Sequence, residues 1–117
     1  MNVLTLQIKR EFLDKILSGK KKEEFREIRP NNSKKYIEYF MADDGEEDVR
    51  PKDVNRIQFF NGYKADRPEV IIEVKKSEIE YIIDEDGNPI EYEENGEFYM
   101  TAQMVYTLGK VVSKKNI

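Results

Sequence analysis

Residues 1–28 are predicted to form a strand, a helix and a second strand in close succession, with one glycine between the helix and the second strand. The helix is predicted over residues 10–18, where an apolar stripe at helical spacing is formed by Phe12, Leu13, Ile16 and Leu17. Gly19 is expected to end that helix in the left-handed conformation. Residues 3–8 and 21–28 are predicted strands, and Phe25, on the face opposite Glu24 and Arg26, is expected to lie in the core.

The rest of the chain is expected to be mostly strands. A second helix is predicted over residues 34–41, with Tyr36, Ile37 and Phe40 turned inward, and the acidic residues 42–48 are expected to form an exposed loop. Further strands are predicted over residues 56–60, 69–75, 77–83 and 98–108, with turns at residues 86–89 and 95–96. The pattern predicts an α+β fold in a single domain spanning residues 1–117: two short helices near the N-terminus and five or six mostly antiparallel strands in a strongly curved sheet or a small barrel.

Three absent residue types restrict the chemistry. The chain has no cysteine, histidine or tryptophan, which excludes disulfides, thiolate or imidazole metal sites and Ser-His-Asp catalysis. The acidic turn at residues 84–88 has its glycine at the wrong position for a calcium loop, so no metal and no cofactor are expected. No apolar segment is long enough to span a membrane, and we expect a cytoplasmic protein.

Charge is unevenly distributed along the chain. The net charge is −4, but residues 1–40 hold ten Lys and Arg against six Asp and Glu, whereas residues 41–117 hold ten against eighteen. The positive charge is therefore concentrated around the segment that follows the first helix. This pattern is compatible with a polyanionic ligand, and equally with a solvated basic face that balances acidic loops.

The segment Gly19-Lys20-Lys21-Lys22-Glu23-Glu24-Phe25-Arg26 has the spacing G-x-K-x-x-E-x-R. Gly19 allows a tight turn, and Lys21 can present an ammonium group to a phosphate or an oxyanion. Glu24 and Arg26 lie on one strand face, where a carboxylate can accept a hydrogen bond from an exocyclic amine and a guanidinium can hold a phosphate or stack on a base. The alternative is that Glu24 and Arg26 only form a salt bridge that holds the strand.

This motif, placed between a helix and a strand, resembles the hallmark of the ASCH domain family. Residues 4–8, 59–63, 70–74 and 106–110 also resemble segments of small ASCH-like proteins of bacteria and their phages. The resemblance implies a PUA-like fold, a compact pseudo-barrel in which the motif lines a cleft. It also implies binding of RNA or of a nucleotide-like small molecule, with Gly19, Lys21, Glu24 and Arg26 as ligand-binding residues.

Two other functions remain open. One bacterial branch of the family hydrolyses acylated cytidine nucleosides, and here Lys21 and Glu24 would be the catalytic residues, acting as an acid/base pair on bound water. That branch has a threonine three positions after the motif lysine, where this chain has Glu24, so a hydroxyl nucleophile is missing. The third possibility is a protein-interaction module that engages a protein partner through its acidic loops.

A second candidate patch follows the strand over residues 56–60. Asn61 could read a base edge and Tyr63 could stack on a base, with Lys64 as a neighbouring positive charge. The alternative is that Asn61 and Gly62 only shape a turn and that Tyr63 packs against the core.

Overall fold

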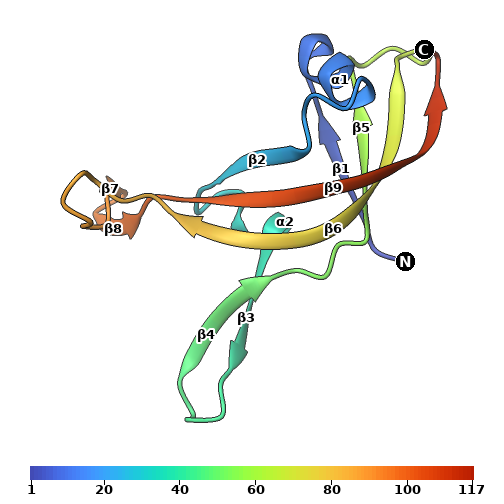
Figure 1. The fold of residues 1–117 in the computed structure, drawn as a ribbon. Helices are drawn as coiled ribbons and strands as arrows, with labels where there is room; N and C mark the ends of the chain where they lie inside the picture. The colour runs from blue at the N-terminus through green and yellow to red at the C-terminus, as the bar shows by residue number, and fades with distance from the viewer. The chain divides into compact units, whose positions relative to one another are not determined.

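The computed structural model describes all residues 1–117, which form nine strands and two short helices (Figure 1). The chain divides into two compact units. The first contains residues 1–24, 53–77 and 106–117, and the second contains residues 25–52 and 78–105. Three strands, β2 (Glu23–Ile28), β6 (Glu69–Tyr81) and β9 (Ala102–Lys115), run from one unit into the other, so each unit takes its residues from several separate parts of the sequence.

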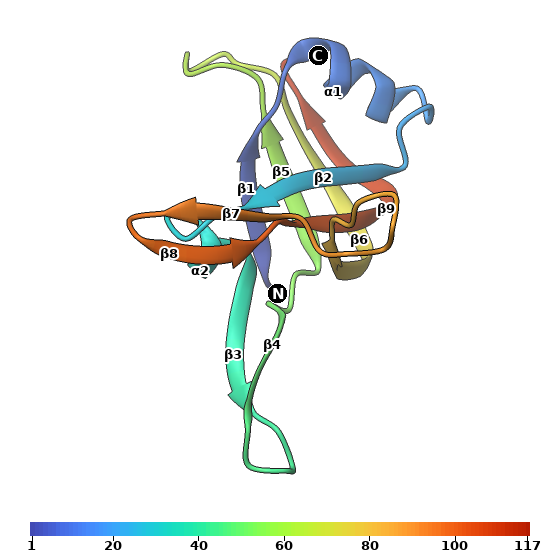
Figure 2. The same cartoon turned by 90° about the vertical axis from the view of Figure 1, so that its left-hand side faces the viewer.

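The first unit is built on β1 (Val3–Gln7), α1 (Arg10–Leu17) and β5 (Arg56–Phe60) (Figure 2). β1 pairs with β5 in parallel, and β5 pairs with β6 in antiparallel orientation. The register brings three buried side chains together across these strands, because Phe59 is opposite both Leu6 and Val70. Apolar residues at every second position therefore form the core of this unit.

The second unit contains two antiparallel hairpins. After α2 (Ser33–Tyr36), strand β3 (Ile37–Met41) pairs with β4 (Glu47–Pro51), and β7 (Glu91–Glu94) pairs with β8 (Glu97–Met100). The β7–β8 turn is the predicted Asn95-Gly96, and both residues have positive φ, 53° and 83°. A two-residue turn of this kind matches the twist of a hairpin, which explains why Asn and Gly occupy it.

The α+β class, the dominance of strands and the two short helices are confirmed. The five strands of the main sheet pair in the order β1-β5-β6-β9-β2 with β1 and β2 at its edges, so the sheet is not closed into a barrel. The β1–β5 pair is parallel, whereas β3–β4, β5–β6 and β7–β8 are antiparallel, in keeping with the mostly antiparallel pairing that was expected.

Three sequence predictions of local structure are wrong. The helix predicted over residues 34–41 is only one turn, Ser33–Tyr36, and the chain continues as β3 because residues 37–41 find strand partners in β4. The acidic loop is shorter than expected, since residues 47 and 48 already belong to β4. The long strand predicted from residue 98 is interrupted at Thr101, so the exposed Phe98 and Met100 belong to β8 and not to the face that Met104 continues.

Candidate functional site

The motif begins where α1 ends. Gly19 follows the last helical turn with φ of +79°, and its N–H donates to the Ile16 carbonyl at 3.1 Å. The next turn brings Lys21 back to the helix, because its N–H donates to the Lys15 carbonyl at 3.0 Å. The predicted left-handed cap is therefore confirmed, and it fixes the backbone from which the Lys21 side chain leaves.

We expect Gly19→Ala to lower the free energy of unfolding by about 1–2 kcal/mol, the usual cost of the left-handed conformation for a residue with a Cβ. Apart from Gly19 and its two chain neighbours, no atom lies within 4 Å of the position where that Cβ would be, so backbone strain is the expected penalty. Urea unfolding of Gly19→Ala and of the neighbouring exposed control Lys20→Ala measures the difference. Equal stability of the two variants would contradict the prediction.

Lys21 and Glu24 form a partly buried ion pair. The Lys21 Nζ lies 3.7 Å from the Glu24 Oε1, and the two side chains are 20% and 8% exposed. The same ammonium group is 5.9 Å from the centre of the Phe12 ring. Glu24 is the only charged residue of the chain that is buried. Removing a carboxylate from water is costly even beside a cation, so this position is chemically unusual for the chain.

One residue of β2, Phe25, was predicted to lie in the core, and the structure shows the reverse. Phe25 is 46% exposed, whereas Glu24 and Ile28 are buried. The prediction that Phe25 and Glu24 point to opposite faces is correct, but the core lies on the side of Glu24. Strand alternation gives two faces and does not say which one is covered; that is decided by the register of the sheet.

Arg26 follows Glu24 by two positions in β2 and is partly buried. It belongs to the second unit, whereas Gly19, Lys21 and Glu24 belong to the first. Of the predicted motif residues, the first unit thus brings together the glycine, the lysine and the glutamate.

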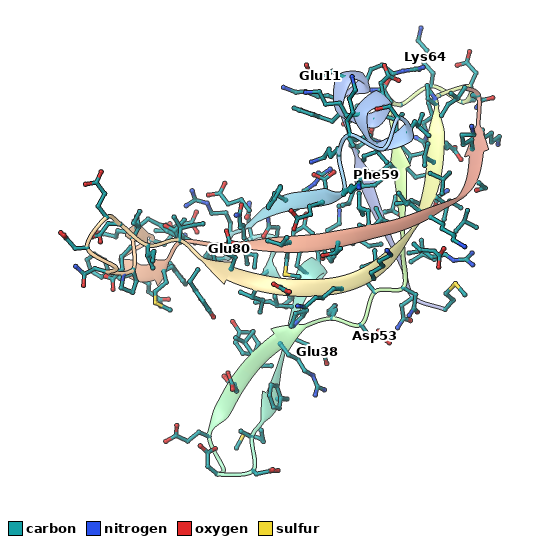
Figure 3. The ribbon with its side chains drawn as sticks, viewed as in Figure 1. Glu11, Glu38, Asp53, Phe59, Lys64 and Glu80 are labelled. Atoms are coloured by element: carbon teal, nitrogen blue, oxygen red, sulfur yellow. The ribbon has the colours of Figure 1, made fainter.

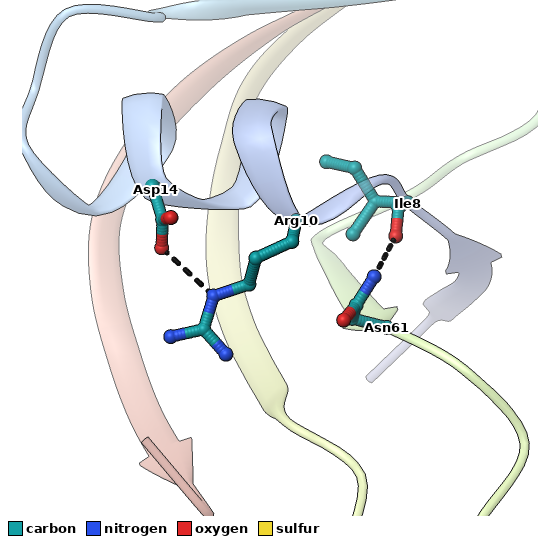
Figure 4. A network of polar contacts seen from close by, with 4 residues as sticks. All are labelled: Ile8, Arg10, Asp14 and Asn61. Carbon is teal, nitrogen blue, oxygen red and sulfur yellow. Dashed lines mark hydrogen bonds and ion pairs between the residues drawn. The ribbon is translucent and has the colours of Figure 1, made fainter.

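The patch after β5 is anchored near the start of α1 (Figure 4). The Asn61 Nδ2 donates to the Ile8 carbonyl at 2.9 Å, and the Asn61 backbone N–H donates to the Pro68 carbonyl at 3.0 Å. The amide side chain therefore holds the loop to the end of β1. Because α1 has eight residues and rises about 1.5 Å per residue, roughly 12 Å of helix separates this anchor from the Gly19 turn.

Tyr63 and Lys64 are both exposed in this loop (Figure 3 labels Lys64). Tyr63 is 85% exposed, so the alternative in which it packs against the core is wrong. Its ring is open to a ligand, but no contact ties Tyr63 or Lys64 to the Lys21–Glu24 pair. The sequence predicted two candidate sites, the motif and the patch after β5. The motif follows the end of α1, whereas the patch is anchored near the start of α1.

The two units differ strongly in charge. The first holds fourteen Lys and Arg against eight Asp and Glu, a net charge of +6. The second holds six against sixteen, a net charge of −10. The difference in net charge between the two units is larger than the difference between residues 1–40 and residues 41–117. The reason is that residues 53–77 and 106–117 add further lysines and arginines to the unit that contains Lys21.

Sequence reasoning missed a pocket of about 190 Å³ in the second unit. Arg29 lies over the Tyr92 ring, with its Cζ 4.2 Å from the ring centre, and Tyr92 stacks on Tyr99 at 5.6 Å between centres. Tyr92 and Tyr99 are a cross-strand pair of β7 and β8, equidistant from the Asn95-Gly96 turn, and that symmetry was a readable signal in the sequence. The pocket is lined by Ile28, Arg29, Pro30, Ser33, Ile37, Tyr39, Val49, Ile79, Tyr81, Tyr92, Tyr99, Met100 and Ala102.

Two groups of this pocket have perturbed pKa values. The Tyr99 hydroxyl donates to the Glu97 carboxylate at 2.8 Å, and this hydrogen bond, followed by desolvation and by the charges of Glu97 and Glu94, raises the pKa of Tyr99 above its ordinary value. The ion pair of Arg29 with Glu27, at 2.5 Å, raises the already high pKa of Arg29. Both shifts have neighbouring carboxylates as a cause.

We expect Glu97→Gln to lower the pKa of Tyr99 toward the ordinary value of a phenol, near about 10. Because the pKa of Tyr99 is raised in the folded protein, folding favours the neutral phenol. The stabilisation by neutral Tyr99 is fully present below the pKa of the unfolded chain and is lost as pH rises through the pKa of the folded protein. NMR titration of the Tyr99 ring measures the shift, with Glu93→Gln on β7 as the control. A Tyr99 titration that is the same in both variants would refute the prediction.

No family model matches the chain, and no curated protein or solved structure matches it either. The resemblance to the ASCH family therefore stays a prediction. Neither α1 nor α2 has the length and apolar composition that a membrane-spanning helix requires. No group of three or more acidic side chains is arranged to hold a metal ion.

Proposed function

We propose that this chain is a small ASCH-like domain with a PUA-like fold that binds RNA or a nucleotide-like molecule beside Lys21 and Glu24. The observation that carries the proposal is the Lys21–Glu24 pair, which holds the one buried carboxylate of the chain in a unit with a net charge of +6. Burying a charged group is costly, and such groups are often kept at functional sites.

Each residue has a physical role in this proposal. Lys21, whose side chain is 20% exposed, contacts a phosphate or another oxyanion through its ammonium group. The Glu24 carboxylate accepts a hydrogen bond from an exocyclic amine of the base, and Gly19 lets the backbone approach the ligand. Arg26, two positions after Glu24 in β2, is a further candidate for contact with the ligand. Asn61, Tyr63 and Lys64 would contact a ligand long enough to pass α1, such as a single strand, with Tyr63 as a stacking surface.

Hydrolysis of an acylated cytidine is the second candidate function, and the same ion pair is the observation that favours it. A lysine and a carboxylate 3.7 Å apart and shielded from water could share the proton transfers that activate a bound water. The protein-interaction alternative would leave this pair without a role in binding and would depend on the acidic second unit.

Binding of a fluorescent single-stranded RNA and of nucleotides, followed by anisotropy and calorimetry, tests the proposal. We expect Lys21→Met to weaken binding at least about tenfold, because a charge-assisted contact to phosphate is lost. The matched controls Lys20→Met and Lys22→Met remove equally charged but exposed neighbours, and we expect changes below about threefold. Binding by the wild-type protein should weaken as salt rises.

Glu24→Gln separates the two candidate functions. The amide keeps a hydrogen-bonding group of the same shape, so we expect binding to survive, whereas proton transfer through a carboxylate would be abolished. Chromatography of acylated cytidines incubated with wild type and Glu24→Gln measures turnover. No binding by wild type, or equal weakening by the three lysine variants, would overturn the proposed function.

A further inference from the structure

The pocket of the second unit has its own chemistry, which does not depend on the proposed function of the first. Four tyrosine rings line it: Tyr39, Tyr81, Tyr92 and Tyr99. Tyr39 and Tyr81 are 63% and 44% exposed, so much of each ring is left uncovered by the protein. Most of the remaining lining residues are aliphatic. Such a pocket offers negative ring faces and few fixed hydrogen-bonding groups.

A cation already occupies one of these ring faces. The Arg29 guanidinium lies 4.2 Å from the centre of Tyr92, a distance at which the ring quadrupole attracts a positive charge. The charge of Arg29 is compensated by Glu27. One tyrosine of the pocket, Tyr92, therefore already holds a cation, and Tyr39 and Tyr81 add two further rings to the lining.

The charges around the pocket determine whether it favours a positively or a negatively charged ligand. The second unit has a net charge of −10, and residues 78–105, which contain three of the four tyrosines, hold nine acidic residues and no lysine or arginine. A carboxylate also contacts the lining directly, since the Tyr99 hydroxyl donates to Glu97 at 2.8 Å; this hydrogen bond is the main cause of the raised pKa of Tyr99, and the charges of Glu97 and Glu94 add to it. A phosphate-bearing ligand would be repelled here, whereas a cation would be attracted.

The volume limits the size of the ligand. Pockets that enclose drug-sized molecules usually measure about 300–1,000 Å³, and this one measures about 190 Å³. It suits a group of the size of one side chain. We propose that this tyrosine pocket binds a small organic cation whose charge is spread over methyl groups or a guanidinium, such as a methylated ammonium group.

The first test compares choline with 3,3-dimethylbutanol, which has the same shape without the charge. Two-dimensional NMR of the tyrosine rings follows titration of each probe into the 117-residue chain. We expect choline to shift the rings of Tyr81 and Tyr92 and to bind at least about fivefold more tightly than the alcohol, since the charge supplies the attraction. Equal binding of the two probes would show an unselective apolar pocket and would overturn the proposal.

Variants locate the site. Tyr81→Leu keeps an apolar side chain but removes the ring, and we expect choline binding to weaken at least about threefold, whereas Tyr81→Phe retains it. Phe98→Leu removes an exposed aromatic ring that does not line the pocket; it is the matched control and should leave binding unchanged. Because Tyr81 is 44% exposed, its replacement is not expected to unfold the protein, and circular dichroism verifies this.

Two further titrations identify the source of the cation and test the charge argument. A short peptide with one trimethyllysine that binds at least tenfold more tightly than choline would identify a modified side chain as the ligand, and equal affinities would identify a free small molecule. Adenosine monophosphate should not shift the pocket tyrosines. Binding of the nucleotide here, or no binding of either cation at millimolar concentration, would refute the inference.

Discussion

Replacing Phe59 with alanine should lower the free energy of unfolding by about 3–5 kcal/mol, the largest effect expected from one substitution in this chain. Phe59 is 0% exposed and lies in the middle strand of three, opposite Leu6 on β1 and Val70 on β6, which are also buried. Its removal leaves a cavity that paired strands on both sides cannot easily fill. Urea or thermal unfolding followed by circular dichroism measures the loss.

Phe98→Ala is the matched control for Phe59→Ala. It deletes the same atoms from a side chain that is 71% exposed, and we expect a change within about 0.5 kcal/mol. If both variants lost the same stability, the core of the first unit would not be centred on β5. If Phe59→Ala were harmless, the β1–β5–β6 register would be wrong.

Lys21→Met should lower the free energy of unfolding by about 1–3 kcal/mol, because it removes the cation that lies 3.7 Å from the carboxylate of Glu24, a residue that is 6% exposed. This value is below the 3–5 kcal/mol typical of a fully buried pair, since the Lys21 side chain is 20% exposed and water screens part of the interaction. The control Lys22→Met removes an exposed charge and should change stability by less than about 0.5 kcal/mol.

The double variant Lys21→Met with Glu24→Leu completes the cycle. Replacing both charges by apolar groups removes the cost of burying a carboxylate, so we expect stability to return to within about 1 kcal/mol of wild type. A double variant that is as unstable as the sum of both single variants would show that the two residues act independently. Recovered stability without ligand binding would mean that the pair is kept for function and not for folding.

The two candidate sites complement each other in charge. The Lys21–Glu24 site lies in a unit with a net charge of +6, and the tyrosine pocket lies in a unit with a net charge of −10. Opposite fields favour different ligands, an anion at the first site and a cation at the second. The two sites can therefore be tested separately. Salt and Lys21 variants affect binding at the Lys21–Glu24 site, and Tyr81 variants affect binding at the tyrosine pocket.

Local sequence signals determined much of the secondary structure. The apolar stripe of Leu13 and Ile16 fixed α1, the positive φ of Gly19 followed from its place after that helix, and Asn95-Gly96 fixed a hairpin. These features depend on side chains within a few residues, so the sequence contains the complete cause. The Lys21–Glu24 pair is also local, since the two residues are only three positions apart.

Only the tertiary structure decided which faces are covered. Alternation in β2 placed Phe25 and Glu24 on opposite sides, but the covered side is that of Glu24, so the hydrophobic residue is exposed and the charged one is buried. Residues 37–41 are compatible with helix or strand, and pairing with β4 selected the strand. Tyr39 and Tyr81 are 42 positions apart and line one pocket only because the fold brings their strands together. Burial and pockets arise from contacts between distant segments, whose free energy outweighs the local preference of any single segment.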